Sequence, residues 1–241
     1  ENRYQIQLVQ EKARSIEMFG RRNLAVVSSL RAALELAGDP AIVSSPQTES
    51  RLGSLLRENP DLIALYIEPA DSESLSVFRA EALTRADVDG IAAELSANPS
   101  KAKVAIGGPR RIETSGQSVM AFASEVNIDG VKVADVVAIA SLQSISQNVV
   151  GISAAKESEL WSAGLPIVFV VDQTGQTIFH PDSSVASSRK KMGDLKIVQE
   201  WLESGLQVQS ALVPFTANFE DSNYEMIGAY STAAVADGYF V

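Results

Sequence analysis

The segment Leu165 to Asp182 has the sequence LPIVFVVDQTGQTIFHPD and is the most informative part of the chain. Its first seven residues are apolar, as in a buried strand. Asp172 to Gly175 then form a turn, in which the glycine can adopt the positive φ that such turns need. A second apolar stretch ends at His180. The pattern predicts a β-hairpin whose first strand runs from Leu165 to Val171.

A less regular copy of this hairpin lies about a hundred residues earlier. The sequence from Leu62 to Phe78 is LIALYIEPADSESLSVF, again an apolar strand, a polar turn and a second apolar stretch. Each hairpin is followed by a helical pattern and further strands. This repetition predicts that one small sheet module is used twice.

Composition narrows the class of protein. The chain has 241 residues, of which 46% are hydrophobic and 21% charged, enough for one large or two small domains with a real core. The formal net charge of -10 repels nucleic acid and anionic lipid, so we expect neither as a partner. Cysteine is absent, which excludes disulfides, thiolate metal sites and a cysteine nucleophile.

Membrane attachment is not visible in the sequence itself. No segment approaches the roughly 20 apolar residues of a membrane span, and no signal peptide is recognised. The first residue is Glu1, and the last ones follow Gly238 in what the pattern indicates to be a strand. We therefore expect an excised domain whose flanking segments include its membrane attachment.

The first element is a long helix from Tyr4 to Ala37, because apolar residues recur there at a spacing of three or four. Gly38, Asp39 and Pro40 end it. Such a helix would be roughly 50 Å long, which favours a stalk that spans two stacked modules or pairs with a second copy. An ordinary long core helix is the alternative.

Two modules follow, assigned to residues 41–150 and 151–241, with residues 1–40 as the stalk. In the first, we expect helices at Gln47–Glu58, Arg85–Ser96 and Leu142–Val150, and strands at Leu62–Glu68, Ala102–Ile106, Ser118–Ile128 and Val131–Ala140, the last two joined at Asp129-Gly130. In the second module, a connector that ends at Gly164 comes before the hairpin. After the hairpin we expect a loop containing Ser183, Ser184, Ser187 and Ser188, and then a helix Asp194–Glu203 with its aspartate at the N-cap. The last elements are two strands, Val208–Phe219 and Tyr224–Ala233, joined at Asp221-Ser222-Asn223, and a final strand near Tyr239. The expected fold class is α+β, each module being an antiparallel sheet flanked by helices.

The order of these pieces resembles the double Cache sensor domain, found outside the cytoplasm in many bacterial receptors. The matching segments are Asn59–Tyr66 at the entry to the first strand, Val136–Leu142 (VVAIASL), Val170–Asp182 (VVDQTGQTIFHPD), and Tyr224–Tyr230 (YEMIGAY) followed by Gly238-Tyr239. They are spread over nearly the whole chain. The resemblance rests on their order and spacing, because none is specific alone.

The resemblance implies a long N-terminal helix and two PAS-like modules, 41–150 distal and 151–241 proximal to the membrane. It implies a periplasmic or extracellular domain of an inner-membrane receptor, with flanking transmembrane helices, a cytoplasmic output of unknown type and a small ligand bound mainly in the distal module. No cofactor is expected. Amino-acid-binding members carry an arginine with a Trp-Tyr pair and an aspartate. Here only Arg79 and Arg85 are present, and Ala140 stands at the aspartate position. The expected ligand is therefore a small organic acid or another polar metabolite.

Eight residues are candidates for ligand contact. Alternation along the strands puts Met120, Phe122 and Ser124 on one face, and Tyr66 with Glu68 on one face of another strand. Asp135 interrupts an apolar strand and is either a pocket residue or an edge residue facing water. The basic side chains of Arg79 and Lys103, which can bind a carboxylate, complete the set. The full set is Tyr66, Glu68, Arg79, Lys103, Met120, Phe122, Ser124 and Asp135.

Other residue types give weaker signals. Arg110-Arg111 after a glycine turn and the basic run Arg189–Lys191 are most simply solvated loops. His180 is the only histidine, so no histidine metal cluster is possible, and we expect it to make a structural hydrogen bond. Known catalytic motifs are absent, so we do not expect an enzyme.

Two alternatives to a sensor domain remain. The first is a ligand-free structural or dimerisation module of a receptor that senses through a partner. The second is a soluble cytoplasmic PAS-like regulator.

Overall fold

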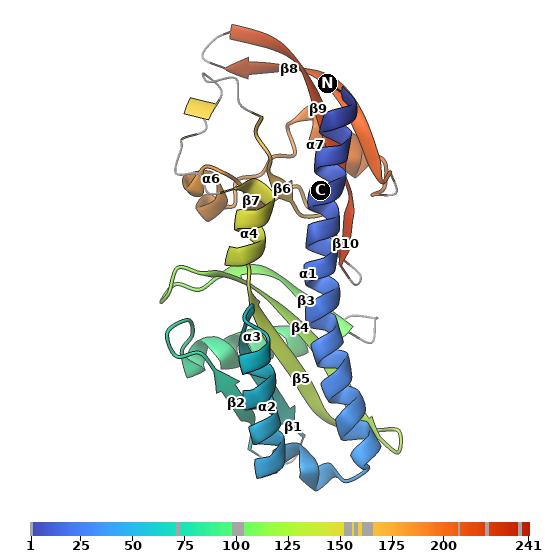
Figure 1. Cartoon of the computed structure of the whole chain (residues 1–241), viewed down its shortest axis with the longest axis vertical. Coiled ribbons are helices and arrows are strands. Elements are labelled where there is room, and N and C mark those ends of the chain that lie inside the picture. The colour runs from blue at the N-terminus through green and yellow to red at the C-terminus, as the bar shows by residue number, and fades with distance from the viewer. Residues whose placement is uncertain are drawn as a thin grey trace. The chain divides into compact units, whose positions relative to one another are not determined.

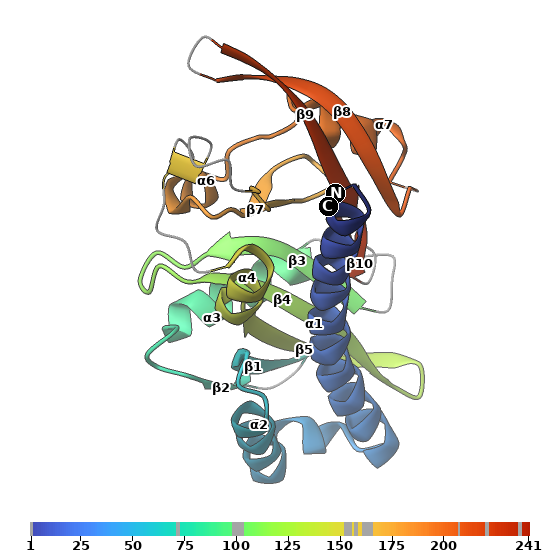
Figure 2. The same cartoon turned by 45° about the horizontal axis from the view of Figure 1, so that its top comes forward.

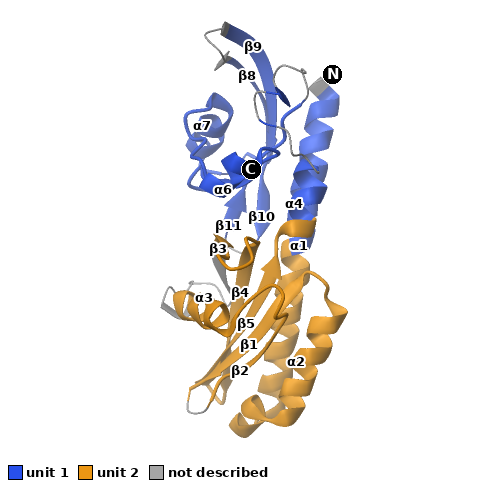
Figure 3. Ribbon diagram, turned by 90° about the vertical axis from the view of Figure 1, so that its left-hand side faces the viewer, with its two compact units in different colours: residues 1–19, 145–241 blue, residues 20–144 orange. Residues whose placement is uncertain are grey.

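The structure is a computed structural model that describes residues 2–70, 73–97, 104–151, 156, 159–160, 166–206, 208–219, 222–235 and 238–241. It divides into two compact units, coloured separately in Figure 3. The five-stranded unit is Gly20–Ser144, and the C-terminal unit combines Glu1–Phe19 with Ile145–Val241. The long N-terminal helix thus contributes one half to each unit, where the sequence was interpreted as a separate stalk over residues 1–40.

The elements up to residue 150 follow the predicted order (Figure 1). They are α1 (Asn2–Ala37), η1 (Pro40–Ser44), α2 (Pro46–Glu58), β1 (Leu62–Pro69), β2 (Leu75–Phe78), α3 (Arg85–Ala97), β3 (Val104–Arg111), β4 (Ser118–Ile128), β5 (Val131–Ser141) and α4 (Gln143–Val150). The strands form one antiparallel sheet in the order β2-β1-β5-β4-β3. The α+β fold class is confirmed.

Local sequence explains the boundaries of these elements. Gly38 has a φ of 66°, which ends α1 without the steric cost that a side chain would bring. The side chain of Ser45 accepts the N–H of Thr48 and caps α2, which then begins at a proline. Asp129 and Gly130 both have positive φ, as the two-residue turn between β4 and β5 requires.

The five-stranded sheet lies between helices. Figure 3 shows the five-stranded unit with α3 on one side of the sheet and α1 and α2 on the other. Both faces of its central strands are therefore buried: Ile139 and Phe122, on opposite faces, have no exposed surface. A sheet covered on both faces explains why the central parts of β4 and β5, Val119–Ala123 and Val136–Ala140, are continuously apolar.

The C-terminal unit contains shorter strands. Its elements are β6 (Val170–Val171), β7 (Thr177–Phe179), α6 (Ser183–Ser188), α7 (Lys196–Glu203), β8 (Ser210–Phe219), β9 (Ser222–Ser231), β10 (Ala233–Val235) and β11 (Gly238–Phe240). The antiparallel pairs are β6 with β7, β8 with β9, and β10 with β11. Val241, directly after β11, exchanges two backbone hydrogen bonds with Val171 of β6.

Helix α7 lies against β8 and β9 in this unit (Figure 2). Trp201 is fully buried, and its Nε1 donates to Oγ1 of Thr232 at 2.8 Å. Ile197 of the same helix packs onto Gly228 of β9 so closely that a Cβ there would meet Ile197 Cδ1 at 2.5 Å. A side chain at position 228 would therefore require the end of the Ile197 side chain to shift.

Three predictions for this unit are wrong in detail. The predicted first strand of the hairpin is reduced to Val170–Val171, although β6 and β7 do pair around Gly175 at a φ of 74°. The serine-rich loop is the short helix α6, capped by the carboxylate of Asp182. Helix α7 has Leu195 rather than Asp194 at its N-cap. The turn predicted around Asp221 lies partly outside the described residues.

Among the helices that the structure describes, none combines the length and the apolar character of a membrane-spanning segment.

Candidate functional site

Tyr66 lies on the face of the five-stranded sheet that α3 covers, here called the α3 face. It belongs to a buried apolar cluster made by strands β1, β4 and β5, the segment before α3, and α3 itself. The cluster consists of Ile63, Ala64, Tyr66, Ala82, Leu83, Val88, Ile91, Ala92, Leu95, Ile112, Val119, Ala121, Ala123, Val137 and Ile139, with Phe78 packed against it. The side chains on the sheet side of this cluster are mostly small.

Met120, Phe122 and Ser124 lie on the opposite face, here called the α1 face. All three are buried, and Oγ of Ser124 accepts from Arg31 of α1 at 3.4 Å. Side chains alternate along β4, so these residues point away from the cluster of Tyr66. The predicted set therefore does not form one site, because the sheet separates Tyr66 from Met120 and Phe122.

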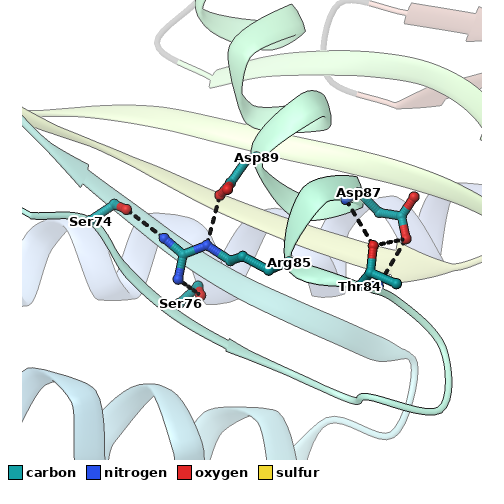
Figure 4. A network of polar contacts seen from close by, with 6 residues as sticks. All are labelled: Ser74, Ser76, Thr84, Arg85, Asp87 and Asp89. Atoms are coloured by element: carbon teal, nitrogen blue, oxygen red, sulfur yellow. Dashed lines mark hydrogen bonds and ion pairs between the residues drawn. The ribbon is translucent and has the colours of Figure 1, made fainter.

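Arg85, in the first turn of α3, is the centre of a polar network at the edge of the α3 face (Figure 4). Its Nη1 and Nη2 donate to the hydroxyls of Ser76 and Ser74 at 2.8 and 2.7 Å, and its Nε donates to Asp89 at 2.9 Å. The guanidinium also lies over the Tyr66 ring, 5.9 Å from its centre. Arg85 thus connects β1, the start of β2 and α3.

Asp87 is the second centre of this network. Its Oδ2 accepts the backbone N–H and the hydroxyl of Thr84 and the hydroxyl of Thr114, and the Asp87 N–H donates back to Thr84 Oγ1. The reciprocal pair is a capping box at the start of α3. The hydrogen bonds from Thr84, which favour the charged form, hold the pKa of Asp87 below its ordinary value of 3.8.

Glu68 and Asp135 are neighbours across β1 and β5, and Glu125 is paired with Asp135 from β4. Lys132 Nζ lies 2.8 Å from Asp135 Oδ2 and 3.3 Å from Glu125 Oε1. The hydrogen bond to Asp135 is the main cause of a raised pKa of Lys132. Glu68 is exposed, whereas the side chain of Asp135, on the central strand β5, is only 17% exposed and is paired with Lys132.

The Arg79 side chain is hydrogen-bonded to two backbone carbonyls. Its Nε donates to the backbone oxygen of Leu62 at 3.0 Å and its Nη2 to that of Leu56 at 2.8 Å. The first carbonyl begins β1 and the second lies in the last turn of α2, where carbonyls lack helical partners. The guanidinium therefore joins α2 to the sheet through two of its five N–H donors.

The remaining predicted residues add little to a site. Lys103 lies outside the described residues. Arg110 pairs with Glu94 of α3 at 2.7 Å, with both side chains largely exposed. His180 is buried, and its Nδ1 accepts the backbone N–H of Asp182 at 2.9 Å, the structural hydrogen bond that was expected. The part of the chain that the structure describes contains no group of three or more His, Cys, Asp or Glu residues suited to a metal ion.

Sequence reasoning missed the network around Arg85 and Asp87. One signal was present, since Thr84-x-x-Asp87 directly before an apolar helical pattern is the signature of a capping box. Another was not visible: Ser74 and Ser76 reach Arg85 only because β2 pairs with β1. Chemically, the network presents a half-exposed guanidinium and hydroxyls, groups that suit recognition of a small anion or carboxylate.

Comparisons with known proteins give the fold. No family model matches the chain, and no curated protein matches its sequence. Solved structures do match. The ligand-binding domain of the Pseudomonas aeruginosa PAO1 amino acid chemoreceptor PctC, in complex with GABA, has a TM-score of 0.62 at 15% identity, over 99% of this chain and 96% of that one.

Two further structures match over similar lengths. The extracellular domain of the putative histidine kinase mmHK1S-Z2 has a TM-score of 0.65 at 13% identity, covering 99% of this chain and 95% of that one. The sensory domain of the Campylobacter jejuni chemoreceptor Tlp3 with isoleucine bound has a TM-score of 0.61 at 13% identity, covering 99% and 89%. The chain therefore has the double Cache fold of the extracellular sensor domains of bacterial chemoreceptors and histidine kinases.

Proposed function

We propose that this chain is the extracytoplasmic small-molecule-sensing domain of a bacterial inner-membrane receptor. The five-stranded unit is the membrane-distal module and binds the ligand, and the C-terminal unit is the membrane-proximal one. The observation that carries this proposal is the likeness along 99% of the chain to receptor sensor domains, two of which were solved with GABA or isoleucine.

The proposed binding surface is the exposed side of Arg85, at the edge of the α3 face. Half of the Arg85 side chain is exposed, and its two terminal nitrogens each hold one serine hydroxyl. A carboxylate presents two oxygens to a guanidinium in the same way and with charge, so it can replace Ser74 and Ser76. This supports a small organic acid or another polar metabolite as the ligand.

An α-amino group finds less support on this surface. Position 140, where the resemblance implied an aspartate, carries Ala140, and this alanine is fully buried opposite Met120 on the α1 face. Ile139, the neighbouring residue on the α3 face, is apolar. The end of β5 therefore offers no carboxylate to an amine.

A second candidate function is a structural ectodomain that binds no ligand and senses through a partner. It is favoured by the packing of the α3 face, where Ala64, Val88 and Ile139 are fully buried in one apolar cluster. Arg85 also has three partners already within the chain. On this reading the network around Arg85 locks α3 to the sheet.

A thermal-shift screen against organic acids, amino acids, amines, sugars and nucleobases separates the two. A ligand at about a hundred times its Kd stabilises the folded chain by roughly 2.7 kcal/mol, which raises Tm by several degrees. The sensor proposal expects a hit that Arg85→Gln abolishes. Arg110→Gln is the matched control, because Arg110 also pairs with an α3 carboxylate and both arginine side chains are 48% exposed. If no compound of the panel raises Tm, the result supports the structural ectodomain.

Dimerisation through α1 is part of the proposal. Tyr4, Met18 and Leu36 are large apolar residues of this helix with exposed fractions of 67%, 69% and 89%. Sedimentation of the chain at several concentrations tests it, with Met18→Glu and Leu36→Glu expected to shift a dimer toward monomer. A chain that sediments as a monomer at all concentrations would remove this part.

Signalling would use the helix that both units share. Ligand binding can shift the receptor between two states only by the difference in its affinity for them. Because α1 packs on the sheet opposite the proposed site, a displacement of that sheet would pass to α1 and then to flanking transmembrane helices.

A further inference from the structure

The guanidinium of Arg85 has two kinds of partner. Its two terminal nitrogens donate to neutral hydroxyls, those of Ser76 and Ser74, at 2.8 and 2.7 Å, whereas its Nε donates to the carboxylate of Asp89 at 2.9 Å. Figure 4 shows Asp89 and the two serines on different sides of the guanidinium. A charged ligand can replace a neutral hydroxyl, but Asp89 lies four residues further along the same helix and remains beside Arg85. Part of the positive charge of Arg85 is therefore compensated before any ligand binds.

The surroundings of this guanidinium are acidic. Glu73 is exposed and directly precedes Ser74. Asp87 belongs to the first turn of α3, and its lowered pKa keeps it charged at neutral pH. The charge of Arg110 acts on Asp87, but Arg110 is itself paired with Glu94 at 2.7 Å. Carboxylates therefore outnumber guanidinium groups around the proposed binding surface.

The first and the second negative charge of a ligand should therefore have different effects. One carboxylate on the terminal nitrogens of Arg85 gains two charge-assisted hydrogen bonds in place of the hydroxyls. A second carboxylate comes close to Asp89, and Arg85 is the only cation among the six residues of the network in Figure 4. Two like charges about 6 Å apart at a half-exposed site repel each other enough to weaken binding by roughly three- to tenfold at low ionic strength.

We propose that Asp89 determines the specificity of the Arg85 surface, so that this surface binds a monocarboxylate and rejects dicarboxylates. The inference rests on the proposed function and narrows its ligand from a small organic acid to a singly charged one. A doubly charged anion ordinarily binds a cationic surface more tightly than a singly charged one does. The opposite order of affinities is therefore the property that Asp89 would confer.

The test uses acetate and malonate, two probes that differ by one carboxylate. Both are titrated into the chain at neutral pH and low ionic strength, where malonate carries two negative charges. The chemical shifts of the backbone amides of Ser74, Ser76 and Arg85 then give the two dissociation constants. In the parent chain, acetate should bind more tightly than malonate, by roughly threefold.

The variant Asp89→Asn separates the charge of this side chain from its geometry. The amide oxygen can still accept the Nε–H of Arg85, so the guanidinium keeps its position while the negative charge is removed. Malonate should then bind about three- to tenfold more tightly, and acetate should gain less. Glu94→Gln is the matched control, because it lies on the same helix and changes the net charge equally, but Glu94 pairs with Arg110. It should leave the ratio of the two dissociation constants unchanged.

A preference for acetate that Asp89→Asn removes supports the proposal. The proposal is wrong if malonate binds the parent chain as tightly as acetate does. It is also wrong if Asp89→Asn leaves the ratio of the dissociation constants unchanged, or if Glu94→Gln alters that ratio equally, because net charge alone then sets the order. If neither acid shifts the three amides, the proposed binding surface itself is wrong, and this inference is overturned with it.

Discussion

The guanidinium carbon of Arg85 lies 5.9 Å from the centre of the Tyr66 ring, so the first turn of α3 is fixed over the first strand of the five-stranded sheet. A cation over an aromatic face at an exposed site contributes about 0.5–1 kcal/mol. The same guanidinium also holds Ser74, Ser76 and Asp89. One side chain therefore joins three segments that are separate in sequence.

Replacing Arg85 with Gln removes these contacts. Because the side chain is half exposed and the Asp89 pair is a surface pair, we expect the free energy of unfolding to fall by only about 1–2 kcal/mol. Urea denaturation measures this change. Arg110→Gln removes one exposed ion pair and should cost less than about 1 kcal/mol. Equal losses in the two variants would argue against a special role for Arg85.

Arg79 should matter for stability and not for ligand affinity. Arg79→Met keeps the aliphatic part of the side chain but leaves the carbonyls of Leu56 and Leu62 without their donors. We expect a loss of about 1–3 kcal/mol in unfolding free energy. Calorimetric titration of a panel hit should give an unchanged Kd. A variant that unfolds normally but loses the ligand would contradict this assignment.

A larger residue at Gly228 should be destabilising while Ile197 is present, because the end of the Ile197 side chain must shift. In Gly228→Ala the new Cβ would lie 2.5 Å from Ile197 Cδ1 and 3.1 Å from Phe215 Cε1, so these side chains must shift. Overpacking of this kind costs typically about 1–3 kcal/mol. The Ile197→Val change removes the Cδ1 atom, so the double variant should be less destabilised than the sum of the two single ones. Additive losses in a thermal melt would show that the contact does not limit packing.

Acid should weaken the start of α3 through Asp87. The pKa of Asp87 is lowered in the folded chain, so folding favours its charged form. That contribution is present above the ordinary value of 3.8 and is lost as pH falls through the lower folded value. Asp87→Asn should therefore flatten the fall of Tm with pH in this acid range. Parallel slopes for the parent and Asp87→Asn would contradict the prediction.

Turns and helix ends could be predicted because they depend on local chemistry. The turn at Asp129-Gly130 and the end of α1 at Gly38 follow from positive φ, which neighbouring residues do not alter. The bounds of β4 were predicted to the residue, since a long apolar strand followed by such a turn has few alternatives. The order of elements, and with it the fold class, rests on these signals.

The faces of the sheet could not be predicted in the same way. Both faces of β4 are apolar because helices cover both, so alternation separates Phe122 from Ala121 without saying which one faces α3. Likewise, nothing local in Arg79 shows that its partners are backbone carbonyls. The prediction of a strand before Val170 is wrong for a related reason. A strand requires a neighbouring strand, and strand pairing is not a local property of the sequence.

The most direct test of the proposed sensor is the backbone amide NMR spectrum of the chain, recorded during titration with each compound of the panel. We predict that one small acid or polar metabolite shifts resonances concentrated at Tyr66, Ser74 and Arg85, with little change at Gly228 in the C-terminal unit. A spectrum that no compound changes, or shifts confined to the C-terminal unit, would contradict ligand binding at the α3 face.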